Sequence, residues 1–407
     1  MTDSLAGSHP LAGANRTIQQ YLRAFQATTS VLVVAPARIA DVAAQPYFAG
    51  WCITDCTSRF VTPTSASASD GPDELIFESS GTTGDPKLVR YRKHVVRECA
   101  VAIAKALALD PARDYVSLVN PRFAYGLSIL HSHLLASVPV RFDSAPSTLD
   151  AWARFRETLS PNSAIYLAPH HSFLLAQDPT WRFDAPIELV FAGGAVRQSM
   201  VDLLHACFPN AMVTNMYGQA ELGPRISIGR SAIAEFQEGN VGRPLPGVRV
   251  RATPATDAEG PEGDIAVSSP YCMTSYVTVT GAPRDSGAPS EWWQTGDVGT
   301  VSPTGDVLIA GRAASDVNFL GTRIRLDQVR QVVRAVEGVL DARVSAVPHP
   351  VYGECPHIRV LVRSLAEAPD RLERALRMAL SDNIGNAAAA VVVEFVDPGW
   401  LPESGKL

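Results

Sequence analysis

Short apolar runs rich in valine and isoleucine alternate with helical stretches along the first half of the chain. The runs are residues 30–36, 115–119, 163–169, 187–194 and 211–218. Residues 199–208 have helical periodicity, and residues 87–107 are predicted to form one long amphipathic helix. Strands that alternate with helices predict a parallel sheet covered by helices, with ligand-binding loops at the strand ends.

The pattern changes twice towards the C-terminus. From about residue 240, Gly- and Pro-rich turns predict a more antiparallel region, and residues 62–72 predict a surface loop. After residue 310, short strands alternate with amphipathic helices such as 325–336 and 371–380.

We therefore expect an α/β protein of two unequal domains. The large N-terminal domain, residues 1–310, would combine parallel α/β sheets with a β-rich subdomain. Residues 311–407 would form a small, mobile C-terminal α+β domain with a hinge near residues 311–315.

Composition narrows the class of protein. The chain has 407 residues, of which 46% are hydrophobic and 19% charged, as in an ordinary globular protein. The net charge of −6 argues against a nucleic-acid or anionic-membrane partner. No basic-then-apolar signal pattern precedes residue 17, so we expect a cytoplasmic protein. The six cysteines lack the spacing of a zinc site, and we expect reduced thiols.

The segment 77–91, FESSGTTGDPKLVRY, carries the first candidate chemistry. Its small residues and glycines would let backbone amides and hydroxyls approach one anion, with Lys87 as a positive charge suited to phosphate. A plain surface loop is the alternative, because serine, threonine and glycine are common turn residues. The segment is not a Walker loop, because Pro86 precedes Lys87 and Leu88 follows it.

Further short motifs follow in order. They are FAGGAV at 191–196, NMYGQAELG at 215–223, VGRPLPG at 241–247, TGD at 295–297, GRAASD at 311–316 and SGK at 404–406. Each is weak alone. Together with SGTTGDPK at 80–87, the set resembles the adenylate-forming superfamily of acyl-CoA synthetases, aryl-acid ligases, nonribosomal adenylation domains and luciferases.

The resemblance implies an ATP-binding site with Mg²⁺. Lys406, Glu221 and Lys87 would be catalytic, and Glu221 would also be the metal ligand. The residues implied to bind ATP or AMP are Ser79, Ser80, Gly81, Thr82, Thr83, Gly84, Gly193, Gly194, Ala195, Asn215, Met216, Tyr217, Gly218, Asp297 and Arg312. Asp297 and Arg312 would meet the ribose, and the loop 79–84 would hold the β- and γ-phosphates.

The sequence departs from the family pattern in three places. Ala220 stands where the family has a threonine that contacts phosphate, and Ala314 where it has a hinge Asp or Lys. The region before the first motif is shorter than in most relatives, which implies a trimmed N-terminal subdomain.

The acid pocket is implied to lie along residues 119–140, with Phe123, Tyr125 and Gly126 as candidates. Packing in the core is an equally good reading of Tyr125. The segment RFDSAPS at 141–147 comes too late to be the amine anchor of amino-acid-activating relatives. We therefore expect an aryl or short acyl carboxylic acid without an α-amine as substrate.

The implied function is ATP-dependent adenylation of a small carboxylic acid, then transfer to a thiol of coenzyme A or of the phosphopantetheine on an acyl carrier protein. Two alternatives stay open. The acceptor of the acyl group would be a nitrogen or oxygen nucleophile in the first, and the chain would be a nonenzymatic nucleotide-binding relative in the second.

Overall fold

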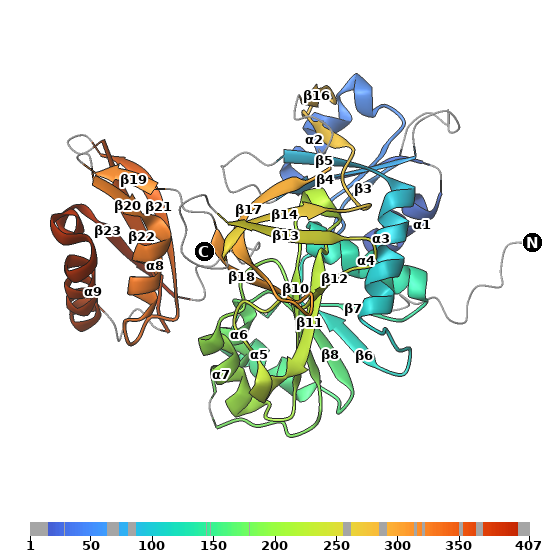
Figure 1. The fold of residues 1–407 in the computed structure, drawn as a ribbon. Helices are drawn as coiled ribbons and strands as arrows, with labels where there is room; N and C mark the ends of the chain where they lie inside the picture. Colours follow the sequence, from blue (N-terminus) through green and yellow to red (C-terminus); the bar gives the residue numbers. More distant parts are fainter. Residues whose placement is uncertain are drawn as a thin grey trace, which may run out of the picture.

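The computed structural model describes residues 15–27, 29–62, 73–79, 87–143, 145–146, 148–178, 180–254, 262–284, 291–312, 316–319, 322–349, 353–363 and 369–397. These residues form four sheets with helices packed around them (Figure 1). The helices are α1 (Arg16–Gln26), α2 (Ile39–Ala43), α3 (Lys93–Ala106), α4 (Ala124–Ala136), α5 (Leu149–Glu157), α6 (His171–Leu175), α7 (Gln198–Cys207), α8 (Leu326–Arg334) and α9 (Pro369–Ile384).

One seven-stranded sheet has the order β12-β11-β10-β9-β8-β6-β7. Its strands are β6 (Asp114–Ser117), β7 (Arg141–Phe142), β8 (Ser163–Leu167), β9 (Glu188–Phe191), β10 (Met212–Tyr217), β11 (Ser227–Ala232) and β12 (Arg243–Pro244). The strands β7, β6, β8, β9 and β10 run parallel, and four of them lie in the predicted apolar runs. The prediction of a parallel α/β sheet is confirmed here, because continuous apolar runs suit strands that are buried on both faces.

The second seven-stranded sheet has the order β16-β15-β5-β4-β1-β2-β3 and mixes parallel and antiparallel pairs. Its strands are β1 (Val31–Val33), β2 (Cys52–Thr54), β3 (Phe60–Val61), β4 (Glu74–Ser79), β5 (Lys87–Arg92), β15 (Ser275–Val277) and β16 (Pro283–Arg284).

The prediction of one helix over residues 87–107 is wrong in its first part. Residues 87–92 form β5, and the helix α3 begins only at Lys93. The strand β5 is paired on both sides, with β4 and with β15, so its backbone hydrogen bonds are satisfied within the sheet. Tertiary pairing has overridden a helical pattern that holds from residue 93 onwards.

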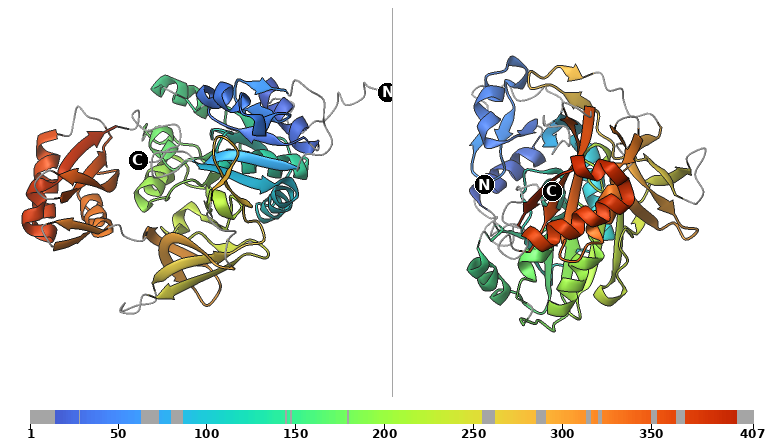
Figure 2. Two further views of the ribbon diagram at one scale, coloured as in Figure 1. Left: turned by 90° about the horizontal axis from the view of Figure 1, so that it is seen from above. Right: turned by 90° about the vertical axis from the view of Figure 1, so that its left-hand side faces the viewer.

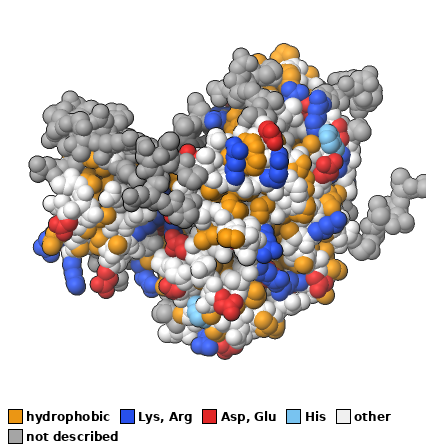
Figure 3. Space-filling view, in the orientation of Figure 1, with side chains coloured by type: hydrophobic (Ala, Val, Ile, Leu, Met, Phe, Trp, Pro, Cys, Tyr) orange, Lys and Arg blue, Asp and Glu red, His pale blue; other side chains and the backbone are white. Residues whose placement is uncertain are grey.

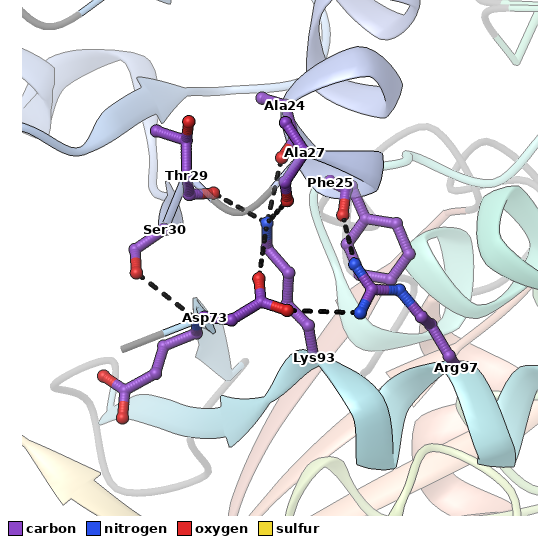
Figure 4. Close-up of polar contacts among 9 residues, drawn as sticks. Ala24, Phe25, Ala27, Thr29, Ser30, Asp73, Lys93 and Arg97 are labelled. Atoms are coloured by element: carbon purple, nitrogen blue, oxygen red, sulfur yellow. Dashed lines mark hydrogen bonds and ion pairs between the residues drawn. The ribbon is translucent and has the colours of Figure 1, made fainter. Parts of the chain in front are cut away.

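A buried lysine ties the start of α3 to the end of α1 (Figure 4). The Lys93 ammonium is fully buried and donates to the carbonyls of Ala24, Ala27 and Thr29 at 2.9, 2.8 and 2.6 Å. It also pairs with Asp73 at 3.1 Å. Lysine near a helix C-terminus satisfies carbonyls that have no partner inside the helix. This cluster is therefore structural, and it fixes the helix that flanks the candidate site.

A four-stranded antiparallel sheet follows in the region predicted to be β-rich. Its order is β13-β14-β17-β18, and it comprises β13 (Arg249–Pro254), β14 (Gly263–Ser268), β17 (Trp293–Val301) and β18 (Val307–Arg312). This sheet carries the TGD motif on β17, next to the end of β10.

The last sheet lies in a lobe at one end of the molecule, set apart at the left of Figure 1 and of the left view in Figure 2. It has the order β20-β19-β22-β21 with β23 beside β22. The strands are β19 (Asp316–Phe319), β20 (Thr322–Arg325), β21 (Asp341–His349), β22 (Gly353–Leu361) and β23 (Val392–Val396). With α8 and α9 it encloses its own core, which includes Val329, Ile358 and Leu376.

This C-terminal sheet touches the rest of the chain through a small apolar cluster. Phe173 and Met200, from α6 and α7, pack against Leu361 and Val396 of the C-terminal sheet. The domain boundary at residue 310, the hinge and the mobility of the lobe stay predictions.

Other sequence expectations can be compared with the described residues. All six cysteines are unpaired, as expected for reduced thiols. No helix in the described part of the chain is both long and apolar enough to cross a bilayer. Acidic and basic side chains are mixed over the face shown in Figure 3. The loop predicted at 62–72 lies outside the described residues, except for Thr62.

Candidate active site at the start of β5, the end of β10 and the middle of β17

The serine- and glycine-rich loop joins two antiparallel strands, not a strand and a helix. Ser79 ends β4 and Lys87 begins β5, and the two residues face each other in register. The predicted phosphate-binding residues between them, Ser80, Gly81, Thr82, Thr83 and Gly84, lie outside the described residues. The Lys87 ammonium lies 5.1 Å from the ring centroid of Tyr276, so this cation is held over an aromatic face.

Glu221 belongs to the same group. The Tyr276 hydroxyl donates to Oε1 of Glu221 at 2.6 Å, and Tyr276 comes from β15, the strand that pairs with β5. Burial and the neighbouring Glu221 carboxylate raise the pKa of Tyr276, so it stays a neutral donor. Lys87, Tyr276 and Glu221 thus form one connected cluster. Sequence reasoning missed Tyr276, because its place beside Glu221 depends on the pairing of β15 with β5.

Asp297 is the centre of a second polar group. It is 6% exposed, and its Oδ2 accepts hydrogen bonds from the Tyr217 hydroxyl at 2.6 Å and from Nε2 of Gln219 at 3.1 Å. Gln219 also donates to the carbonyl of Thr295 at 2.8 Å. On β18, Arg312 lies opposite Asp297 in register. The two motifs YGQAE and TGD, 80 residues apart between Tyr217 and Asp297, therefore meet.

Two hydrogen bonds to the Tyr91 hydroxyl fix the turn from Ala220 to Leu222. The Tyr91 hydroxyl donates to the Ala220 carbonyl at 2.6 Å and accepts from the Gly223 amide at 2.9 Å. A Cβ at Gly218 would lie 2.1 Å from the carbonyl oxygen of Pro224, so only glycine fits there. The Ala220 backbone is thus fixed by Tyr91, whatever side chain residue 220 carries.

The predicted adenine-binding residues follow β9 and end β10. Gly193, Gly194 and Ala195 are exposed, and Gly193 has φ +85°, a conformation that favours glycine. Asn215 is buried and donates to the Asn240 carbonyl at 2.9 Å, while Met216 lies in the core. The exposed backbone of 193–195 is therefore open to a flat ligand.

An apolar cavity lies along α4, the helix within the segment 119–140 that was predicted to line the acid pocket. Ala124, Leu127, Ser128 and His131 of α4 line an apolar cavity together with residues of β4, β5, α3 and the turn after β10. These four follow the spacing of one helix face. The predicted candidates Phe123, Tyr125 and Gly126 are not among the lining residues.

The candidates have other surroundings. The Tyr125 hydroxyl donates to the Val190 carbonyl at 2.9 Å, and its Cδ1 would lie 3.7 Å from a Cβ at Gly193. A Cβ at Gly126 would meet the Asn120 carbonyl oxygen, so Gly126 permits close packing at the start of α4. Phe123 precedes α4 and stacks under the guanidinium of Arg122.

A buried arginine beside this cavity was missed from the sequence. Arg225 follows the turn after β10, and its guanidinium lies 4.4 Å above the ring of Tyr125. Its Nη2 donates to Oγ of Ser128 at 2.9 Å. Arginine just after the motif ending at Gly223 was the available signal, but nothing in the sequence indicated that this side chain turns inwards.

The described residues fit a Mg²⁺ site in which most of the coordinating oxygens come from a bound substrate and not from the protein. In the part of the chain described here, no group of three or more His, Cys, Asp or Glu side chains is arranged so that it could hold a metal ion by itself. Mg²⁺ is commonly bound by one or two carboxylates together with substrate phosphates. Glu221 beside Lys87 offers one such carboxylate, held in place by Tyr276.

Some predicted residues cannot be located. Lys406 and Ala314 lie outside the described residues, and the structure gives the backbone position of Arg312 but not its side chain.

Comparisons with known proteins identify the family. The model of the AMP-binding enzyme family matches residues 30–277. The chain belongs to this family, and so to the adenylate-forming superfamily that its motifs resemble.

Individual relatives are distant. A probable CoA ligase, CCL8, of Humulus lupulus is 25% identical over 334 residues, which cover 75% of this chain and 54% of that protein. The 4-coumarate–CoA ligase 2 of Oryza sativa subsp. japonica is 27% identical over 371 residues, 85% of this chain and 62% of that protein. The chain thus spans little more than half the length of these relatives.

Solved structures share the fold. The amide bond synthetase McbA of Marinactinospora thermotolerans superposes with a TM-score of 0.60 at 22% identity, over 97% of this chain and 82% of that one.

Proposed function

We propose that this protein activates a small carboxylic acid with ATP and then passes the acyl group to a thiol. The observation that carries the proposal is the convergence of two polar groups at the end of β10: Lys87, Tyr276 and Glu221 on one side, and Tyr217, Gln219 and Asp297 on the other. They join three motifs far apart in the sequence, in a chain that belongs to the AMP-binding enzyme family.

The chemistry needs charge neutralisation and alignment. A carboxylate is a poor acyl donor because oxide is a very poor leaving group. In the proposed reaction a carboxylate oxygen attacks the α-phosphorus of ATP, the bond to the β-phosphate oxygen breaks, and pyrophosphate leaves. A thiolate then attacks the acyl carbon, and AMP leaves with the electron pair of the broken C–O bond. Positioning and electrostatics supply the acceleration in reactions of this kind.

Each cluster has a part in this proposal. Asp297 accepts the ribose hydroxyls, and the backbone of 193–195 with Tyr217 lies along the adenine. Lys87 and the loop 80–84 bind the phosphates. Glu221 would hold Mg²⁺, which neutralises phosphate charge when bound.

Lys406 would bridge the carboxylate and the α-phosphate, as the resemblance implies. This role requires Lys406 to reach the group at the end of β10 and the middle of β17, and it is part of the proposal. The substrate we propose is an aryl or short acyl carboxylic acid. The acceptor is coenzyme A or the phosphopantetheine of a carrier protein.

The test is acid-dependent exchange of pyrophosphate into ATP, measured with a panel of aryl, short acyl and α-amino acids. We expect exchange with one class of acid lacking an α-amine, and AMP release that accelerates when coenzyme A or pantetheine is added. No exchange with any acid would leave a nucleotide-binding relative without activity. AMP release that depends on an added amine, with no effect of thiol, would replace the proposed acceptor.

A further inference from the structure

Tyr91 is a buried residue that joins both ends of the turn carrying Glu221. Its hydroxyl donates to the Ala220 carbonyl at 2.6 Å and accepts from the Gly223 amide at 2.9 Å. Tyr91 is 1% exposed, and burial raises its pKa well above that of an exposed tyrosine, so the hydroxyl stays neutral and can both donate and accept. One side-chain group therefore satisfies two backbone groups of the turn.

The turn is too short to satisfy these backbone groups by itself. Residues Ala220–Leu222 form a single turn of 3-10 helix, in which the Leu222 amide donates to the Gln219 carbonyl at 3.2 Å. A helical turn of this length leaves carbonyls and amides at its ends without partners inside the helix. The position of the turn therefore depends on hydrogen bonds from outside it, and Tyr91 supplies two of them.

The turn presents side chains to both polar groups of the candidate site. Gln219, which precedes the turn, donates through Nε2 to Oδ2 of Asp297 at 3.1 Å. Oε1 of Glu221, within the turn, accepts from the Tyr276 hydroxyl at 2.6 Å. Gln219 and Glu221 flank Ala220, whose carbonyl is the one held from outside. A shift of the Ala220 backbone would therefore move both side chains at once.

Tyr91 also shares a strand face with Lys87. Lys87 is the first residue of β5, and side chains at positions 87 and 91 lie on the same face because they alternate along a strand. The Lys87 ammonium lies over the ring of Tyr276, which bonds to Glu221. The strand β5 thus places a cation near the Glu221 carboxylate and a hydroxyl against the backbone of its turn.

We propose that Tyr91 is a positioning residue for adenylation, which acts through the turn on Glu221 and Gln219 together. The inference rests on the proposed function, because it assigns Glu221 to Mg²⁺ and Asp297 to the ribose. Tyr91 itself touches neither the nucleotide nor the metal. Its hydroxyl fixes the backbone of residue 220, so that the carboxylate and the amide are in place before the nucleotide binds.

The proposal is tested with Tyr91→Phe, which removes the hydroxyl and keeps the ring that stacks on Phe77. We expect kcat of pyrophosphate exchange to fall about tenfold, with little change in KM for the acid. The Mg²⁺ concentration for half-maximal exchange should rise at least about threefold. The Kd for AMP, measured by calorimetry without Mg²⁺, should also rise at least about threefold, because Gln219 loses its fixed place beside Asp297.

Tyr271→Phe is the matched control. Tyr271 is 8% exposed and also packs beside Gly223, but its hydroxyl donates to the Pro246 carbonyl at 2.9 Å and not to the turn. The change removes the same atom from a buried tyrosine in the same neighbourhood. We expect it to lower the thermal stability and to leave the Mg²⁺ requirement and the Kd for AMP unchanged. Tyr276→Phe should raise the Mg²⁺ requirement alone, because that hydroxyl bonds to the Glu221 side chain.

The outcomes separate a positioning role from a structural one. If Tyr91→Phe lowers the thermal stability but changes neither readout, or changes only one of them, the joint role of Tyr91 is overturned. If Tyr91→Phe does not fold, hydrogen exchange of the Gly223 amide in the wild-type protein decides. We expect this amide to be as protected without AMP as with it, and protection that appears only with AMP would overturn the proposal. No exchange of pyrophosphate with any acid contradicts the proposed function, and the Kd for AMP then still decides the role of Tyr91.

Discussion

The two sides of the candidate site differ in how completely their polar groups are partnered. On the side proposed to bind the nucleotide, Asp297 accepts hydrogen bonds from Tyr217 and Gln219, and Glu221 accepts one from Tyr276. Beside the cavity along α4, the Arg225 guanidinium contacts neutral groups among the described residues, and its buried Nε–H has no acceptor there. In a site that binds a ligand common to a whole family, the polar side chains can be preorganised by hydrogen bonds within the protein. At Arg225 the cost of burying a charge is offset by a cation–π contact with Tyr125 and by hydrogen bonds to neutral groups, without a carboxylate among the described residues.

The largest effect that would sharpen this comparison is expected at Asp297. Asp297→Asn removes the charge that would accept the ribose hydroxyls but keeps the shape of the side chain. We expect kcat/KM for ATP to fall about a hundredfold, which corresponds to roughly 2.7 kcal/mol. Because the change acts on the nucleotide, the factor should be the same for every acid in the panel. A factor that varies strongly between acids would show that the two sides are not independent.

A smaller effect is expected where the nucleotide side positions its carboxylate. Tyr276→Phe removes the donor to Oε1 of Glu221 and leaves Lys87 over an aromatic ring. We expect adenylation to fall about fivefold, the worth of roughly one hydrogen bond, with a higher Mg²⁺ requirement. The rate of adenylation should fall further in Glu221→Gln than in Tyr276→Phe when Mg²⁺ is low.

The two substitutions, Tyr276→Phe and Glu221→Gln, can be combined in a double-mutant cycle. If Tyr276 acts through Glu221, the double variant should be no worse than Glu221→Gln alone. Additive losses, or wild-type Mg²⁺ dependence in Glu221→Gln, would contradict the proposed metal role. Thermal unfolding of each variant is the control for folding.

The smallest effect concerns His131 on α4 and the dependence of stability on pH. His131 lines the cavity, and its Nε2 lies 2.6 Å from the Tyr21 hydroxyl. Burial, with the nearby charges of Arg97 and Lys93, lowers the pKa of His131 to about 3. The unfolded chain therefore takes up a proton below about pH 6.5 that the folded chain refuses until about pH 3, so stability is lost as the pH falls through this window.

This loss can be measured with a substitution. His131→Gln should reduce the slope of unfolding free energy against pH by up to about 1.4 kcal/mol per pH unit within that window. Denaturant titrations between about pH 4 and about pH 6, which lie inside the window set by these pKa values, check it. His205→Gln, on α7, is the matched control. It makes the same chemical change away from α4, and we expect the effect on the slope to be specific to His131→Gln. An unchanged slope in His131→Gln would show that His131 is not held neutral.

Much of the nucleotide side could be predicted from the sequence. Glu221, Tyr217 and Asp297 stand in short motifs, and the structure brings the motifs YGQAE and TGD into contact. The apolar runs predicted the parallel strands, because a strand buried on both faces needs continuous hydrophobic sequence. Roles on the loop 80–84, on Lys406 and at the hinge 311–315 stay predictions.

What the sequence alone determined is the order of local signals: runs, turns and motif residues, each fixed by the chemistry of a few neighbouring positions. Only the tertiary structure decided that residues 87–92 are a strand, because that depends on β4 and β15 being available to pair on either side. It alone placed Tyr276 against Glu221 and turned Arg225 inwards over Tyr125. These contacts join positions 55 and 100 residues apart in the chain, and no local pattern carries the energy of such a contact.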